Sequence, residues 1–144
     1  MLQFASWMVE SFYRGFQADT KYLDLEYLEK KYRLPGSRTV NIGGVPVHYT
    51  DSDDPDLDKD LADKTKSKLQ KQPVLICLHG IYGSVHSWVQ STEYLQKHFR
   101  VIALDLPNFG LTGPFPKQTN ITKQTYPEFL SQFLETLNIQ TCSI

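Results

Sequence analysis

The chain has 144 residues, about the length of one domain, and 40% of them are hydrophobic, which is enough to build a core. Its 15 basic and 16 acidic side chains give a formal net charge of −1, which excludes a broad cationic surface for nucleic acid or anionic lipid. We therefore expect a globular protein whose partner is a small molecule.

Cysteine usage and hydropathy favour a cytoplasmic protein. Cys77 and Cys142 lie in apolar segments and have neither the spacing of a zinc site nor that of a disulfide framework. Residues 1–17 lack a basic start, and Glu10 and Arg14 interrupt them, so no signal peptide is indicated. No run approaches the roughly 20 apolar residues that cross a bilayer, so no membrane span is expected. The sequence does not predict the oligomeric state.

Two helices are predicted at the start of the chain. Val9, Phe12, Tyr13 and Phe16 recur at helical spacing and form an apolar stripe that we expect to pack against the body of the protein. A contact with a membrane surface or a second copy is the alternative. The second helix is predicted from Leu25 to Leu34, because a proline and a glycine follow.

After residue 37 the spacing of apolar residues changes from that of a helix to that of a strand. Two short strands, 38–42 and 45–50, flank a glycine pair and predict a tight hairpin. The aspartate-rich and lysine-rich stretch 51–72 has little to bury and is predicted to be a solvated connection. A calcium-binding loop is not favoured there, because the required glycine and closing glutamate are absent. We assign residues 1–36 to an N-terminal helical extension and residues 37–144 to the main domain.

Beyond Pro73 strands and helices alternate, in the order VLICL, SVHSWVQSTEYLQKHF, RVIAL, TYPEFLSQFLETLN and a strand that begins in QTCSI. This alternation predicts parallel pairing of the strands. The strands are nearly continuous apolar runs, as expected where helices cover both faces of a sheet. The predicted fold class is therefore α/β.

The turn after the first of these strands is the segment most suited to chemistry. Gly80 and Gly83 let the backbone turn sharply, and the first N–H groups of the following helix have no internal partner. Such a backbone suits a developing negative charge. A phosphate-binding turn of a dinucleotide-binding fold is the alternative, but the GxGxxG and P-loop patterns are absent.

LHGIYGSVHSW followed by RVIALDLPNFGLTGPF resembles the paired signature of the α/β-hydrolase superfamily. The first segment matches the HGxxGS pattern of the oxyanion turn. The second matches the DxPGxGxS turn, with Asp105, Pro107 and Gly110 in register. Asn108 replaces the usual glycine and Thr112 the usual serine; asparagine accepts left-handed geometry and threonine keeps the hydroxyl.

This resemblance covers about residues 38–144 and implies the N-terminal part of a doubly wound, mostly parallel α/β-hydrolase sheet that stops in its fifth strand. The nucleophile of the superfamily sits on a glycine-flanked elbow directly after that strand, which would be about four to eight positions beyond Ile144. Ser143 lacks the flanking glycines and is predicted to be a strand residue. We therefore expect the 144 residues alone to be inactive.

The resemblance also implies roles for residues at the turn. It assigns the backbone N–H of Ile81 to the oxyanion hole, with His79 and Gly80 supporting the turn. The base of the superfamily lies near the C-terminus, so His79 is expected to be structural. Tyr82 would line the pocket mouth. Trp88 is expected to pack against the sheet, with substrate contact as the alternative.

Other polar residues have no predicted catalytic role. Asp105 resembles the turn-forming carboxylate of the superfamily, and His48, His86 and His98 show no pairing that indicates a metal. No cofactor is implied. In the strand order of the superfamily the fifth strand lies beside the third, yet both cysteines are expected to be thiols, because a disulfide between neighbouring parallel strands fits its preferred dihedral poorly.

The resemblance therefore implies an α/β-fold hydrolase that uses a serine nucleophile on a small-molecule ester or on a carbon–carbon bond of a ring-cleavage product. An aspartate nucleophile, as in the dehalogenase and epoxide hydrolase relatives, is the first alternative. A non-catalytic binding protein that keeps the glycine turns for structural reasons is the second.

Overall fold

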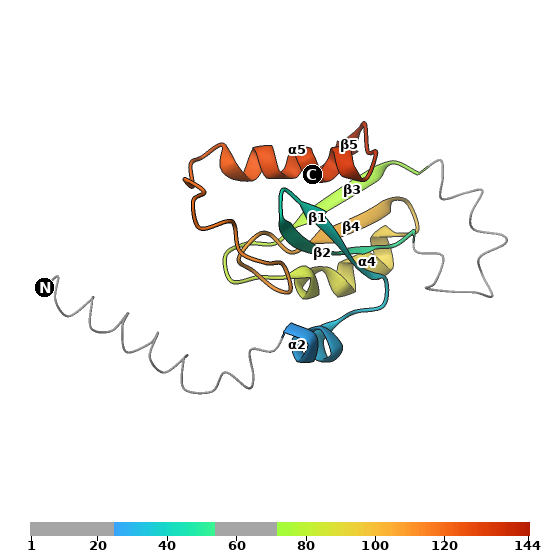
Figure 1. Cartoon of the computed structure of the whole chain (residues 1–144). Coiled ribbons are helices and arrows are strands. Elements are labelled where there is room, and N and C mark those ends of the chain that lie inside the picture. Colours follow the sequence, from blue (N-terminus) through green and yellow to red (C-terminus); the bar gives the residue numbers. More distant parts are fainter. Residues whose placement is uncertain (1–24, 54–71) are drawn as a thin grey trace, which may run out of the picture. The chain divides into compact units, whose positions relative to one another are not determined.

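The computed structural model describes residues 25–53 and 72–144 (Figure 1). The chain divides into two compact units, Met1–Arg33 and Leu34–Ile144. The predicted apolar stripe of the first helix and most of the predicted solvated connection lie outside the described residues.

Helix α2 spans Leu25–Tyr32 and confirms the second predicted helix. Acidic Glu26 lies in its first turn and basic side chains lie in its last, an order that complements the helix dipole. The helix ends earlier than the predicted Leu34. The reason is local, because the Leu34 N–H donates to Ser37 Oγ at 2.9 Å and so leaves the helical pattern.

The predicted hairpin is confirmed. Strands β1 (Ser37–Ile42) and β2 (Val45–Asp51) pair antiparallel, with Ile42 opposite Val45. The two residues between them, Gly43 and Gly44, have φ angles of 57° and 89°. A two-residue turn with positive φ at both positions matches the twist of the strands and strongly favours glycine, so the sequence determines this register.

One residue of the predicted solvated connection is buried instead. Asp51 is the last residue of β2 and is 1% exposed. Its carboxylate accepts two hydrogen bonds from the Arg100 guanidinium, at 3.1 and 2.7 Å. The prediction was wrong at this position because Asp51 was grouped with the acidic residues that follow it. Its cationic partner, Arg100, is distant in sequence, so local composition did not indicate that Asp51 belongs to the strand.

Within the described residues the sheet has five strands, in the order β1-β2-β4-β3-β5. Strands β3 (Val74–Leu78), β4 (Arg100–Leu104) and β5 (Cys142–Ser143) are parallel to one another in the pairs β3–β4 and β3–β5, as predicted. Strand β2 joins them by pairing antiparallel with β4. The result is a mixed sheet whose parallel part carries the glycine turn at the carboxyl end of β3.

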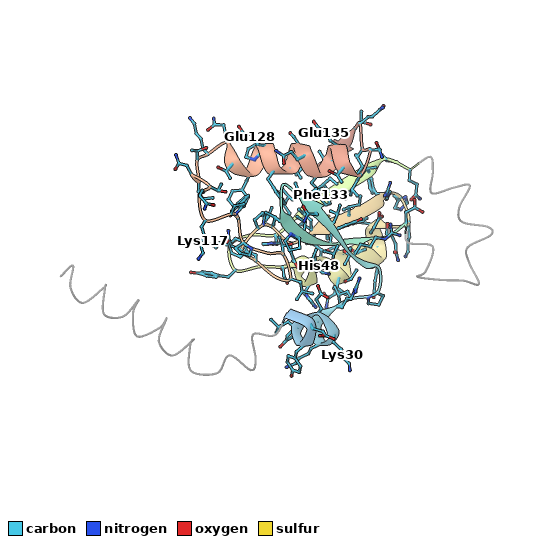
Figure 2. All side chains as sticks on the ribbon, in the orientation of Figure 1. Lys30, His48, Lys117, Glu128, Phe133 and Glu135 are labelled. Atoms are coloured by element: carbon cyan, nitrogen blue, oxygen red, sulfur yellow. The ribbon has the colours of Figure 1, made fainter. Side chains whose placement is uncertain are left out.

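Helices cover both faces of this sheet, and Figure 1 shows α5 and α4 on opposite sides of it. Helix α5 (Thr125–Thr136) places Phe129 and Phe133 against one face. Figure 2 shows Phe133 pointing from α5 toward the sheet. The other face is covered by the 3₁₀ turn η2 (Val85–Trp88) and by α4 (Val89–Leu95).

The segment after β3 was predicted as one helix over residues 84–99, and the structure divides and shortens it. It opens as the 3₁₀ turn η2 and ends at Leu95. The amides of His98 and Phe99 both donate to the Leu95 carbonyl, at 2.9 and 3.0 Å, and form a tight turn into β4. The amphipathic pattern of the sequence continues through this turn, so periodicity alone did not reveal the break.

Candidate active site

The chain bends sharply over residues 79–84, directly after β3. The Gly83 N–H donates to the Gly80 carbonyl at 2.9 Å and closes a turn with Ile81 and Tyr82 at its corners. Tyr82 has a φ of 60°, a region that non-glycine residues rarely adopt. This pattern, with positive φ at the second corner only, is that of a type II turn.

Both corner residues face solvent. Ile81 is 81% exposed and Tyr82 is 91% exposed. Within residues 25–53 and 72–144, no acceptor binds the Ile81 N–H. The turn therefore presents an unpaired backbone donor at the carboxyl end of a parallel strand.

Two consecutive residues after β4 hold the two ends of this bend. His79 is 6% exposed; its Nε2 accepts the Leu106 N–H at 3.0 Å, and its Nδ1 lies 2.8 Å from the Gly80 carbonyl. His79 therefore carries its proton on Nδ1, because a carbonyl only accepts. At the far end, the Val85 N–H donates to Asp105 Oδ1 at 2.7 Å.

Asp105 is the most heavily bonded of these groups and is 1% exposed. Besides the Val85 amide, its carboxylate accepts the Leu111 N–H at 2.9 Å and the His48 Nδ1–H at 2.8 Å. Burial opposes the charge, but the hydrogen bonds from His48, Leu111 and Val85 outweigh it and lower the pKa of Asp105. The carboxylate is therefore ionised and acts as an acceptor only.

The turn after Asp105 accommodates both departures from the superfamily pattern. Asn108 has a φ of 73°, the left-handed geometry that glycine would adopt there. The Thr112 hydroxyl donates to the Asp105 carbonyl at 2.7 Å and accepts the His48 N–H at 2.8 Å. The substituted residues therefore keep the conformation and the hydroxyl that the turn requires.

Sequence reasoning missed the place of His48 in this arrangement. The side chain is 2% exposed, and its Nε2 lies 2.8 Å from Ser37 Oγ, while Nδ1 faces Asp105. The signal available in the sequence was a polar residue between two large apolar residues of a predicted strand, Val47 and Tyr49. Its partners are distant in sequence, so the pattern did not identify them.

Trp88 belongs to the apolar core on the α4 face of the sheet. It is partly buried and packs against a core cluster on the α4 face, formed by Cys77, Val85, Val101 and Ala103. This matches the expected packing against the sheet.

A cavity of about 290 Å³ lies elsewhere, between the Leu34–Pro35 segment, the end of β2, and the η2 and α4 helices. None of the bend residues 79–83 lines it. We place the candidate site at the bend, because the unpaired amide and the converging hydrogen bonds lie there.

Residues 25–53 and 72–144 contain no cluster of three or more histidine, cysteine or acidic side chains that could hold a metal. None of the helices in these ranges has the length and apolar character that a bilayer crossing needs. Cys77 is opposite Ala103 and Cys142 is opposite Val74, and both cysteines are free thiols.

Comparison with known proteins supports the fold. Residues 73–142 match the family model described as the alpha/beta hydrolase fold. A curated relative, the (E)-2-((N-methylformamido)methylene)succinate hydrolase of Acinetobacter baylyi, is 28% identical over 65 residues, which are 45% of this chain and 24% of that protein.

Solved structures show the same likeness. A bacterial membrane phospholipase A superposes with a TM-score of 0.59 at 20% identity, over 99% of this chain and 42% of its own. A meta-cleavage product hydrolase from Pseudomonas fluorescens superposes with a TM-score of 0.52 at 24% identity, over 73% of this chain and 33% of its own. At these identities the likeness is one of fold.

The chain thus spans less than half the length of each of these proteins. Its strand order, the parallel strands that flank the glycine turn, and the family match agree with one another. Residues 73–142 match the α/β-hydrolase family model, and the fold of the chain is that of an α/β hydrolase.

Proposed function

We propose that these 144 residues are the oxyanion-hole part of a hydrolase that acts on a small-molecule ester or carbon–carbon bond. The observation that carries this proposal is the unpaired Ile81 N–H at a bend held at both ends. An amide in a fixed position stabilises a developing oxyanion without reorganisation during the reaction.

In the proposed reaction a serine Oγ attacks the substrate carbonyl and a histidine accepts its proton. The carbonyl oxygen becomes an oxyanion, which accepts the Ile81 N–H and a second N–H from the residue after the nucleophile. Collapse of the tetrahedral intermediate expels the alcohol of an ester or the carbon leaving group of a ring-cleavage product, and the protonated histidine gives its proton to that leaving group. Water then attacks the resulting acyl-enzyme, which releases the acid and restores the serine. Neither reaction requires a cofactor.

His79 and Gly80 have supporting roles in this proposal. Both ring nitrogens of His79 are engaged, one by the Leu106 amide and one by the Gly80 carbonyl. A base needs a free nitrogen that faces the nucleophile, so His79 is better suited to holding the turn. The exposed side chains of Ile81 and Tyr82 would form an apolar mouth beside the oxyanion, whereas the packing of Trp88 supports a core role.

The nucleophile is the part of the proposal that these residues do not supply. No serine among the 144 residues has the glycine on each side that the elbow requires. We therefore expect the isolated 144-residue chain to be inactive toward aryl esters. Active-site-dependent turnover by the purified chain would overturn that expectation.

The proposal is tested by labelling the protein from its native source with a fluorophosphonate probe, and by reading the codons after Ile144. A labelled, glycine-flanked serine shortly after β5 would support a serine hydrolase. A glycine-flanked aspartate would instead indicate a dehalogenase or epoxide hydrolase mechanism. Absence of both, or a stop codon directly after Ile144, would favour a non-catalytic binding protein and contradict the proposal.

A further inference from the structure

Three buried side chains form an unbroken hydrogen-bonded chain beside the bend. His48 Nε2 lies 2.8 Å from Ser37 Oγ, and His48 Nδ1 lies 2.8 Å from Asp105 Oδ2. Ser37, His48 and Asp105 are 9%, 2% and 1% exposed. The three come from β1, β2 and the end of β4, so the chain of bonds links both strands of the hairpin to the parallel part of the sheet.

The direction of each hydrogen bond follows from the chemistry of its groups. The ionised Asp105 only accepts, so His48 carries its proton on Nδ1. Its Nε2 then accepts the Ser37 hydroxyl proton, and Ser37 Oγ accepts the Leu34 N–H at 2.9 Å. Every hydrogen bond in this series is therefore donated in the direction of the Asp105 carboxylate.

The order serine, histidine, aspartate is that of a catalytic triad, but the surroundings do not suit a nucleophile. Ser37 Oγ is already bonded by the Leu34 amide and lies in a residue with little exposure. Ser37 is also absent from the lining of the 290 Å³ cavity. The arrangement is better suited to fixing the position of the Asp105 carboxylate.

Fixing Asp105 fixes the bend. One carboxylate oxygen accepts the His48 proton and the Leu111 N–H, and the other accepts the Val85 N–H. Val85 begins η2, directly after the bend that carries Ile81. Without the His48 proton, the buried carboxylate would lose a charge-assisted bond, and its hold on Val85 would weaken.

We propose that His48 is a positioning residue of the oxyanion bend, acting through Asp105 on the Val85 amide. The catalytic consequence rests on the proposed function, whereas the structural coupling does not. His48 contacts no substrate in this account. Its effect on Ile81 is transmitted by the hydrogen bonds that Asp105 accepts from His48 and from Val85.

The structural coupling is tested by amide hydrogen exchange on the 144-residue chain, with three variants. His48→Leu removes both ring bonds; His48→Asn keeps a donor near the position of Nδ1; Phe133→Leu weakens the opposite core without touching the bend. In His48→Leu we expect exchange at Val85 and Leu111 to accelerate about 10- to 100-fold relative to amides of α5. His48→Asn should restore most of the protection.

The control separates positioning from general destabilisation. Phe133→Leu should accelerate exchange across all amides that open by global unfolding, with no excess at Val85. The same profile in His48→Leu and Phe133→Leu, or no rescue by asparagine, would overturn the proposal. Because His48→Asn retains the donor, the test stays informative where the leucine variant fails to fold.

A kinetic measurement separates this inference from the proposed function. In a catalytically active protein that contains these residues, His48→Leu should lower kcat about tenfold or more with KM little changed, and His48→Asn should recover kcat. A loss confined to KM would contradict positioning. If no preparation shows turnover, the proposed function fails while the exchange result still decides the role of His48.

Discussion

Two aspartates near opposite ends of β4 are equally buried, at 1% exposure each, but they are stabilised by different partners. Asp51 faces one cation, the guanidinium of Arg100, and the Arg100 side chain is 26% exposed. Asp105 faces three converging N–H donors, from Val85, Leu111 and His48. The first arrangement joins two strands through an ion pair in which water can reach only the arginine side chain. The second determines the backbone path of two turns, and the candidate site lies at that end.

Replacing each aspartate by asparagine should give the largest contrast. Asp105→Asn places an amide donor against N–H donors in a buried site, so we expect a loss of about 3 kcal/mol in the free energy of unfolding. Asp51→Asn leaves Arg100 within reach of solvent, so we expect a loss of only about 1–2 kcal/mol. Urea denaturation followed by circular dichroism measures both, and equal losses would contradict the comparison.

Glycine substitutions extend the contrast to the backbone. Gly110 has a φ of 54°, and a Cβ there would overlap the Asp105 carboxylate, so Gly110→Ala should cost about 2–4 kcal/mol. Gly44 has a φ of 89° but open space around it, so Gly44→Ala should cost about 1 kcal/mol. Thermal melts of the two variants compare them directly, and a larger loss for Gly44→Ala would show that overlap at Asp105 does not dominate.

Acid stability should depend on Asp105. Burial raises the pKa of Asp105, but the hydrogen bonds from His48, Leu111 and Val85 lower it by more than burial raises it. The pKa in the folded protein therefore lies below the ordinary value. Such a group contributes stability that is fully present above the unfolded pKa and is lost as the pH falls through the folded pKa. The free energy of unfolding should therefore decline below about pH 4. Asp105→Asn should flatten that decline, and an unchanged pH profile in the variant would argue against this role.

The cysteines give the smallest expected effect. Burial raises the pKa of the Cys77 thiol, so little thiolate is present at neutral pH. Cys142 lies on the short edge strand β5 and is less buried. We expect a thiol reagent to modify Cys142 first and Cys77 only on unfolding. Faster modification of Cys77, or the absence of free thiols, would contradict the structure.

Local patterns predicted most of the elements. The apolar runs of β3 and β4 and the glycine pair of the hairpin depend on neighbouring residues, so a sequence is enough to identify them. Residues 79–83 were identified for the same reason, because strand, glycine turn and helix are consecutive. The contacts that hold the bend join distant positions, and period and composition carry no information about such pairs. The pairing of His48 with Asp105 and the burial of Asp51 were therefore missed.

A proline substitution in the bend can remove the backbone N–H of Ile81 while preserving the turn. Ile81 occupies the first corner of a turn whose second corner has a positive φ. Proline is favoured at the first corner of such a turn. Ile81→Pro therefore fits the turn while it deletes the N–H. Ile81→Ala keeps the N–H and removes the side chain, so it is the matched control.

The most direct measurement is kcat for an aryl ester in a catalytically active protein that contains these 144 residues, with each of the two variants. The account predicts a fall of about 10²- to 10³-fold for Ile81→Pro and a change of only a few fold for Ile81→Ala. Equal rates for the proline and alanine variants would contradict the assignment of this amide to the oxyanion.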